Sequence, residues 1–135
     1  MNTKITTENV FELIQQHELN EKIFSKQLQE EIDFISSHFT EFSEEQEEKL
    51  EQLQIETLER IFSNPKLQLN TEDQLLKLIN HLYLINPANT IFYEKVEFSN
   101  VSANAIKDFL DVFNVNDMTN ETWRLLSFRL EQEII

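Results

Sequence analysis

His17, His38 and His81 are the only histidines of this 135-residue chain, which has no cysteine. No two of them have the spacing that places metal ligands on one helix face, so the sequence predicts no metal site. His17 and His38 lie among apolar residues and are expected to be hydrogen-bonded residues of the core or its boundary, whereas His81 is expected to be exposed. The absence of cysteine excludes disulfides, thiolate metal sites and a catalytic thiol.

The residues that could do nucleophilic or acid–base chemistry are poorly arranged for it. Ser37 adjoins His38, but a nucleophile and its base must face each other with an acid orienting the base, which neighbouring helix positions do not provide. Carboxylate pairs recur, as at 30–33 and 108–111, but 25 Asp and Glu produce such pairs by chance and indicate solvated surfaces. We therefore predict no catalytic residues and no enzyme. A pocket holding a carboxyl with a strongly raised pKa would reverse that prediction.

The chain contains no glycine. Phosphate-binding loops, the dinucleotide fingerprint and the nucleophile elbow all need glycine for close backbone approach or a strained turn, so no cofactor is expected. Tight hairpins also favour glycine, and the many Leu, Glu, Gln and Lys residues favour helices. The fold class predicted is all-α.

Acidic residues dominate the charge, with 11 Lys and Arg giving a formal net charge of -14. Such a balance repels nucleic acids and anionic lipid surfaces, so neither is an expected partner. No apolar run reaches the length of a membrane span, and the first seven residues lack the apolar core of a signal peptide. The expected location is the cytoplasm, with the nucleus as the alternative.

Hydrophobic spacing predicts about seven helices in a single domain over residues 1–135. A helix over 10–17 follows a cap at Thr7, and apolar residues at steps of three and four predict one long helix over 21–42. Ser43 and Gln46 fit a capping box that opens the next helix, which is expected to break near residues 54–56.

The second half of the chain has equally clear boundaries. Pro65 ends the preceding helix, and Thr71 opens a core helix that reaches Tyr83. After a turn at 86–89 a short helix is expected to run into an extended link. The last two helices are capped by Ser102 and Thr119, and their predicted apolar faces carry Ala105, Ile106, Phe109, Leu110, Phe113, Trp123, Leu126 and Leu130.

Trp123 and Arg124 allow two interpretations. Tryptophan and arginine are enriched in the centres of protein interfaces, so this pair could form a partner-binding hot spot. The helical spacing of Trp123 with Leu126 and Leu130 favours packing in the core instead.

The order of these segments resembles the BACK domain, the helical region that follows the BTB domain in many adaptor proteins. Residues 9–14 are similar to its first helix and 32–42 to the end of its second. Residues 58–64 and 67–73 resemble the short helix and the acidic cap before its core helix, and 93–102 resemble the link before the next helix. Glu97 departs from the arginine common in that link, and within these 135 residues no BTB domain precedes the segment and no kelch propeller follows it.

The resemblance implies a non-catalytic scaffold whose first two helices extend a cullin-binding surface. A surface of that kind would lie on the outer faces of those helices, at Phe11, Glu12, Gln15, Lys22 and Lys26. A BTB-containing protein or a cullin is then the expected partner, and a homodimer is a further possibility.

A second hypothesis rests on the acidic run at 44–51. In that case the chain is a helical regulator that docks a basic protein partner. A complex of that kind weakens steeply with ionic strength, whereas a largely apolar complex persists.

Overall fold

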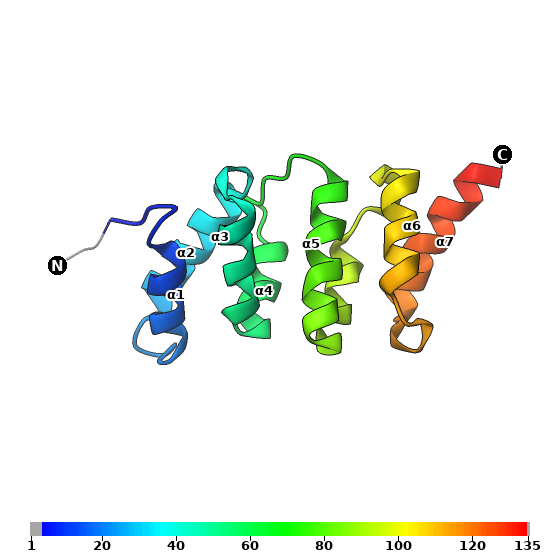
Figure 1. Cartoon of the computed structure of the whole chain (residues 1–135). Helices are drawn as coiled ribbons and strands as arrows, with labels where there is room; N and C mark the ends of the chain where they lie inside the picture. Colours follow the sequence, from blue (N-terminus) through cyan, green and yellow to red (C-terminus); the bar gives the residue numbers. More distant parts are fainter. Residues whose placement is uncertain (1–3, 135) are drawn as a thin grey trace. The chain divides into compact units, whose positions relative to one another are not determined.

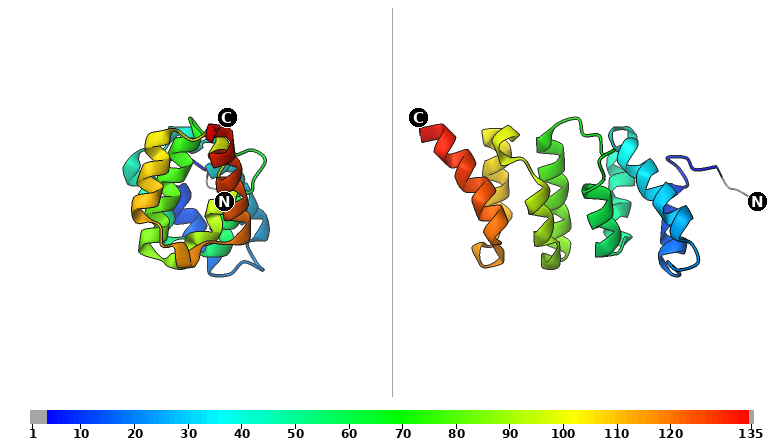
Figure 2. Two further views of the ribbon diagram at one scale, coloured as in Figure 1. Left: turned by 90° about the vertical axis from the view of Figure 1, so that its right-hand side faces the viewer. Right: turned by 180° about the vertical axis from the view of Figure 1, so that it is seen from behind.

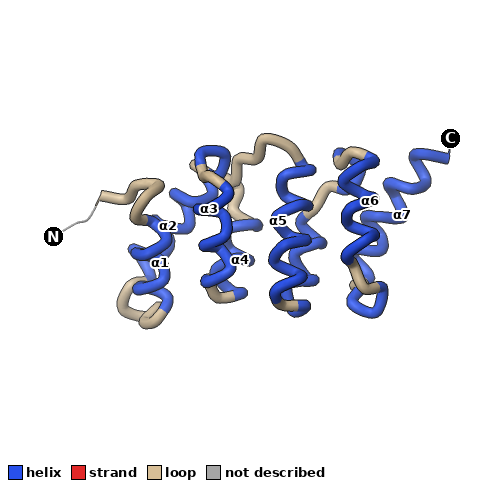
Figure 3. Tube along the Cα trace, viewed as in Figure 1, coloured by secondary structure: helices blue, strands red, loops and turns tan. Residues whose placement is uncertain are grey.

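A computed structural model describes residues 4–134, with side chains described for 4–132. Met1–Thr3, part of the segment considered for a signal peptide, lie outside the described residues. Throughout 4–134 the chain is helix or loop without a strand (Figure 3), which confirms the all-α prediction. Seven α-helices occur there, in agreement with the predicted number: α1 Val10–Glu18, α2 Ser25–Ser37, α3 Glu44–Glu48, α4 Ile55–Phe62, α5 Glu72–Ile85, α6 Ala103–Val112 and α7 Asn120–Ile134.

Five short 3-10 helices connect or extend these α-helices: η1 Phe39–Glu41, η2 Lys49–Gln52, η3 Pro87–Lys95, η4 Phe98–Asn100 and η5 Val115–Asp117. The chain divides into two compact units, residues 1–68 and 69–135. We call them the first and the second unit. A single domain over 1–135 stays a prediction.

The first unit is built on a helical hairpin of α1 and α2 (Figure 1). α2 packs against α4, and α1 contacts η2. Apolar residues at helical spacing fill the interior, and a ring contact of 5.2 Å joins Phe11 to Phe42. The buried apolar residues of this unit are Val10, Phe11, Ile14, Leu28, Ile32, Ile35, Phe39, Phe42, Leu50, Leu53, Leu58, Ile61 and Phe62.

The long helix predicted over 21–42 is shorter at both ends. Residues 19–24 form turns in which the carbonyl of Asn20 accepts the N–H groups of Ile23 and Phe24, so α2 begins only at Ser25. At the other end the backbone N–H and the ring Nδ1 of His38 both bind the carbonyl of Phe34. The bond from the backbone N–H is the ordinary helical one, whereas the bond from the ring competes with continuation of the helix. The prediction of one continuous helix is wrong for that reason.

Helix caps were predicted well elsewhere. Ser43 and Gln46 form both bonds of a capping box, and the side chains of Thr71, Ser102 and Thr119 each accept a backbone N–H three residues on. The predicted break after the acidic run is confirmed, because η2 ends at Gln52 and α4 starts at Ile55. The predicted cap at Thr7 is wrong: Thr6 and Asn9 exchange backbone-to-side-chain bonds of 2.8 and 3.2 Å before α1.

The second unit pairs α5 with η3 and with α6, while α7 packs against η3 and η4. The left view of Figure 2 separates α6 from α7, which lie on different sides of this unit. Aromatic rings of α5, η3 and α6 pack together: the Tyr93 ring lies 5.7 Å from that of Tyr83 and 4.9 Å from that of Phe109. The buried apolar residues are Leu75, Leu76, Leu78, Ile79, Leu82, Tyr83, Phe92, Tyr93, Val96, Phe98, Val101, Phe109 and Leu126.

None of the helices in the described part of the chain combines the length and the apolar character needed to cross a membrane.

Candidate protein-interaction surface

The five residues predicted to bind a partner lie on α1, α2 and the turn between them. Glu12, Lys22 and Lys26 are exposed, and Gln15 is half-buried. Phe11 is only 2% exposed, because it lies on the face of α1 that packs into the core and meets Phe42. Its predicted position on the outer face is therefore wrong. Partner binding by the other four residues stays a prediction.

The turn between α1 and α2 presents two aliphatic side chains to solvent. Leu19 is 85% exposed and Ile23 is 67% exposed. Ile23 lies within the helix predicted over 21–42, but the chain is not helical there, so its side chain does not join the buried face of α2. We call Leu19, Lys22, Ile23 and Lys26 the turn surface. No signal in the sequence separated Leu19 from the core residues of α1.

A polar pair at the boundary of the core fixes the base of this turn. His17 Nδ1 lies 2.7 Å from both carboxylate oxygens of Glu31, and this contact joins α1 to α2. The His17 ring also lies 4.6 Å from the ring of Phe24, the residue before α2. Both ends of the turn are thereby held, and the prediction that His17 is a hydrogen-bonded residue at the boundary of the core is confirmed.

Two further contacts hold the turn against the rest of the first unit. The buried Glu18 carboxylate accepts the backbone N–H of Gln54 at 2.9 Å, just before α4. Arg60 of α4 lies 3.4 Å from Glu21, in the middle of the turn. The exposed Leu19 and Ile23 are consequently carried by a backbone anchored at several points. Preorganisation of this kind reduces the ordering cost of binding a partner.

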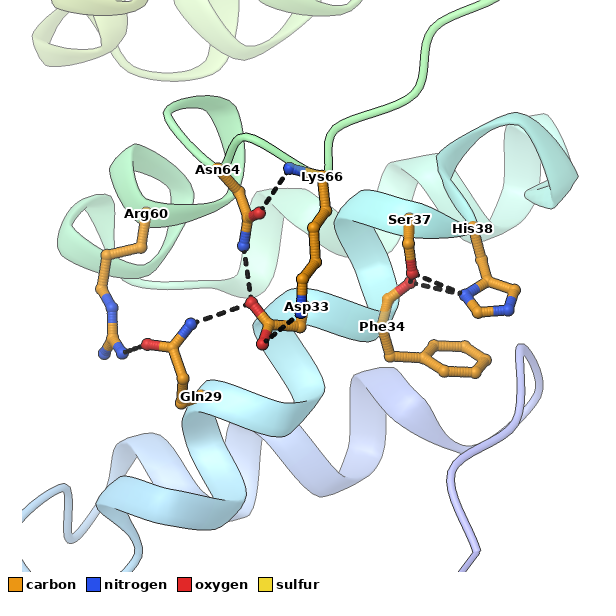
Figure 4. A network of polar contacts seen from close by, with 8 residues as sticks. All are labelled: Gln29, Asp33, Phe34, Ser37, His38, Arg60, Asn64 and Lys66. Atoms are coloured by element: carbon orange, nitrogen blue, oxygen red, sulfur yellow. Dashed lines mark hydrogen bonds and ion pairs between the residues drawn. The ribbon is translucent and has the colours of Figure 1, made fainter.

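Asp33 is the centre of a polar network that joins α2 to the segment after α4 (Figure 4). Its carboxylate accepts hydrogen bonds from Asn64 at 2.8 Å and Gln29 at 2.9 Å, and the Lys66 ammonium lies 3.3 Å away. Gln29 in turn accepts from Arg60. The hydrogen bond from Asn64, followed by those from Gln29 and Lys66, lowers the pKa of the Asp33 carboxyl. The network stabilises the packing of α2 on α4.

Ser37 and His38 are also drawn in Figure 4, and their geometry does not make a nucleophile and base. His38 Nδ1 lies 3.0 Å from the Ser37 hydroxyl and 3.0 Å from the carbonyl oxygen of Phe34. A carbonyl oxygen only accepts, so Nδ1 carries the hydrogen in that bond and cannot take the proton of Ser37. The histidine ring stacks on Phe34 with centroids 4.0 Å apart.

The acidic cluster at 30–33 is only in part the solvated surface that its composition suggested: Glu30 is exposed, but Glu31 is not. Glu31 is 2% exposed, and burial raises the pKa of its carboxyl despite the hydrogen bond from His17. Burial also raises the pKa of the Glu72 carboxyl in the second unit, which accepts the backbone N–H of Glu97. Buried Glu31 is closed to a substrate in this conformation. Within the described residues, no group of three or more His, Asp and Glu side chains could hold a metal ion.

The turn surface differs in charge from its surroundings. Residues 1–68 contain fifteen Asp and Glu against six Lys and Arg. Among the described residues, Lys22 and Lys26 make no hydrogen bond or ion pair, whereas Arg60 and Lys66 are engaged in the contacts above. Two free lysines next to two exposed aliphatic side chains form a small basic and apolar surface on an otherwise acidic unit.

In the second unit the predicted apolar faces of α6 and α7 are only partly buried. Phe109 and Leu126 lie in the core, but Leu110 and Trp123 are 58% and 56% exposed. The interpretation of Trp123 as a core residue is wrong, because the buried face of α7 is centred on Thr122 and Leu126 instead.

In comparisons with known proteins, no family model, curated protein or solved structure matches the chain. The structure shows an all-α protein made of two helical units. The resemblance to BACK domains stays a prediction from the sequence.

Proposed function

We propose that the chain is a non-catalytic protein-interaction module, a BACK-like adaptor that acts in the cytoplasm or nucleus. The observation that carries the proposal is the exposure of Leu19 and Ile23 on a turn that is anchored from both sides. Exposed apolar residues on a rigid base are typical of contacts that a partner covers. The proposed contact surface is the turn surface with Glu12 and Gln15, and the proposed partner is a BTB-containing protein or a cullin.

The absence of a catalytic role is part of the proposal. It is supported by the arrangement at Ser37 and His38, where the histidine nitrogen nearest the hydroxyl already donates to a carbonyl. It is supported also by Glu31, whose raised pKa results from burial in the core and not from a site open to substrate.

Direct binding tests the proposal. The tagged chain would be mixed with a purified BTB-containing protein or the N-terminal region of a cullin, and the complex washed at low and then high salt. We expect an apolar complex that survives high salt and is lost in a Leu19→Ser, Ile23→Ser double variant. Leu84→Ser with Ile85→Ser in the second unit is the matched control, because it also removes an exposed leucine and isoleucine. Equal loss in both variants, or no binding by the unaltered chain, would contradict the proposal.

A second candidate function is supported by α3. None of its five residues is buried, and four of them are glutamates. This helix could serve an acidic regulator that docks a basic partner, as the run at 44–51 suggested. Its complex would dissociate as ionic strength rises, and replacement of Glu44, Glu45 and Glu48 by Gln would weaken it while the Leu19 and Ile23 variant would not.

A further inference from the structure

α7 exposes an apolar stripe along one of its faces. Trp123 is 56% exposed and Leu130 is 40% exposed. They are seven positions apart, which is about two helical turns. The two side chains therefore lie on the same face, about 10 Å apart along the helix axis. We call Trp123, Leu130 and the neighbouring exposed Glu131 the α7 face. Its spacing matches two turns of a second helix.

The helix that carries this face is firmly held. Thr122 and Leu126 are 1% and 4% exposed, and Arg129 donates hydrogen bonds to the carbonyls of Phe98 and Val101. The Thr119 hydroxyl accepts the backbone N–H of Thr122 at the start of the helix. The α7 face is thus presented by a fixed scaffold and needs little reorganisation on binding.

The charges around α6 and α7 are unbalanced. Both arginines of α7 are already engaged, Arg124 with Glu121 and Arg129 with backbone carbonyls. Among the described residues Asp108, Asp111 and Glu131 are exposed and make no ion pair, against the single free Lys107. The free charge on these two helices is therefore acidic, as is the whole chain.

We propose that the α7 face docks an amphipathic helix whose apolar side chains cover Trp123 and Leu130 and whose lysines or arginines face Glu131. Apolar residues at i and i+7 of the incoming helix match the spacing on α7, and the negative charge selects a basic partner. This site belongs to the second unit and shares with the proposed function only the premise that the chain binds proteins.

Trp123 provides a direct readout, because it is the only tryptophan of the chain. The full chain would be titrated with a designed 18-residue helix of Leu and Lys, and in parallel with the same peptide carrying Glu in place of Lys. We expect a saturable blue shift of tryptophan emission with the Leu/Lys peptide, weakened by added salt, and none with the Leu/Glu peptide. A missing shift, or equal binding of the two peptides, would overturn the proposal.

Variants separate this site from general attraction to an acidic protein. Leu130→Ser should weaken binding about tenfold or more, whereas Leu19→Ser should leave it unchanged. Glu131→Lys should weaken binding more than Glu48→Lys, which alters the net charge equally but lies on exposed α3. Docking on α7 would be contradicted if Leu130→Ser and Leu19→Ser weakened binding equally, or if Glu131→Lys and Glu48→Lys did. All variants would first be compared with the unaltered chain by circular dichroism.

Two other occupants of the α7 face have distinct signatures. A blue shift that appears on raising the protein concentration without peptide would assign the face to a second copy of the chain. A blue shift produced by vesicles of phosphatidylserine and phosphatidylcholine, but not by the Leu/Lys peptide, would assign it to a membrane surface. Either result would overturn the proposal. The Leu19→Ser, Ile23→Ser variant should bind the peptide normally even if it loses its BTB or cullin partner.

Discussion

The Nδ1 atom of His17 and the carboxylate of Glu31 lie 2.7 Å apart and join α1 to α2 inside the first unit. Glu31 is almost fully buried, so its carboxylate has exchanged water for this single side-chain partner. Burial raises its pKa, while the hydrogen bond and the charge of His17 act in the opposite direction. The hairpin that carries the turn surface therefore depends on a contact whose strength varies with pH.

Glu31→Gln should flatten part of the pH dependence of stability. A carboxyl whose folded pKa lies above its ordinary value of 4.5 contributes stability below that value and loses it as pH rises through the folded pKa. Glutamine cannot ionise, so the variant should gain stability relative to the unaltered chain as pH rises from 4 to 7. Urea unfolding of both proteins at several pH values measures this difference. A difference independent of pH would contradict the prediction.

His17→Ala leaves the buried Glu31 without its partner. Loss of a partner from a buried polar group costs about 1–3 kcal/mol of unfolding free energy. Because His17 lowers the pKa of Glu31, the variant should also move the titration of that carboxyl to higher pH. Carboxyl carbon chemical shifts in NMR report this titration. Replacement of the exposed His81 by Ala provides the control, which should leave the Glu31 titration unchanged.

Asp33→Ala removes the acceptor shared by Asn64, Gln29 and Lys66. We expect a loss of about 1 kcal/mol at neutral pH, since the site is partly exposed and solvent screens the lysine. The folded pKa of Asp33 is lowered, so its contribution is present above 3.8 and is lost as pH falls through the folded value. The variant and the unaltered chain should thus converge in stability at acid pH. Persistence of the full difference at pH 2 would contradict this.

Two tyrosine hydroxyls in the second unit should differ in their effect on stability. Tyr93 donates to Asn80 at 2.8 Å with both groups buried, whereas Tyr83 donates to the half-buried Asp117 and accepts the N–H of exposed Asn114. Tyr93→Phe leaves a buried amide oxygen unpaired and should cost about 1–3 kcal/mol. Tyr83→Phe should cost less, because water can reach its partners. Urea unfolding compares the two, and the reverse order would count against the prediction.

Ser102→Ala should destabilise α6. The Ser102 hydroxyl accepts the N–H of Ala105, and loss of such a cap costs about 1 kcal/mol, whereas Ser102→Gly costs only a few tenths. The side chain of Ser102, and then its backbone N–H, lower the pKa of Asp73. The alanine variant should therefore also move the Asp73 titration upward in NMR. An alanine variant as stable as the glycine variant would show that the cap contributes little.

Helix formation in this chain could be predicted from local signals. Capping residues at Ser43, Thr71, Ser102 and Thr119, together with the break after Gln52, lie where the sequence indicates them. These signals are local because a cap involves hydrogen bonds between residues three positions apart. The early end of α2 was missed, since it depends on the ring of His38 binding the Phe34 carbonyl.

The sequence by itself determined the all-α class and most residues of the core. The reason is that the helical spacing of apolar residues and the capping of helices both depend on neighbours along the chain. Tertiary structure decided which apolar side chains are exposed to solvent and which are buried in the core. Leu19, Ile23 and Trp123 have the same side-chain chemistry as core residues, and their exposure depends on where turns end and which helix face meets a neighbour. Tertiary structure also decided the environment of Glu31, since burial and a partner fourteen residues away set its pKa. The turn surface and the α7 face are therefore both set by the tertiary structure.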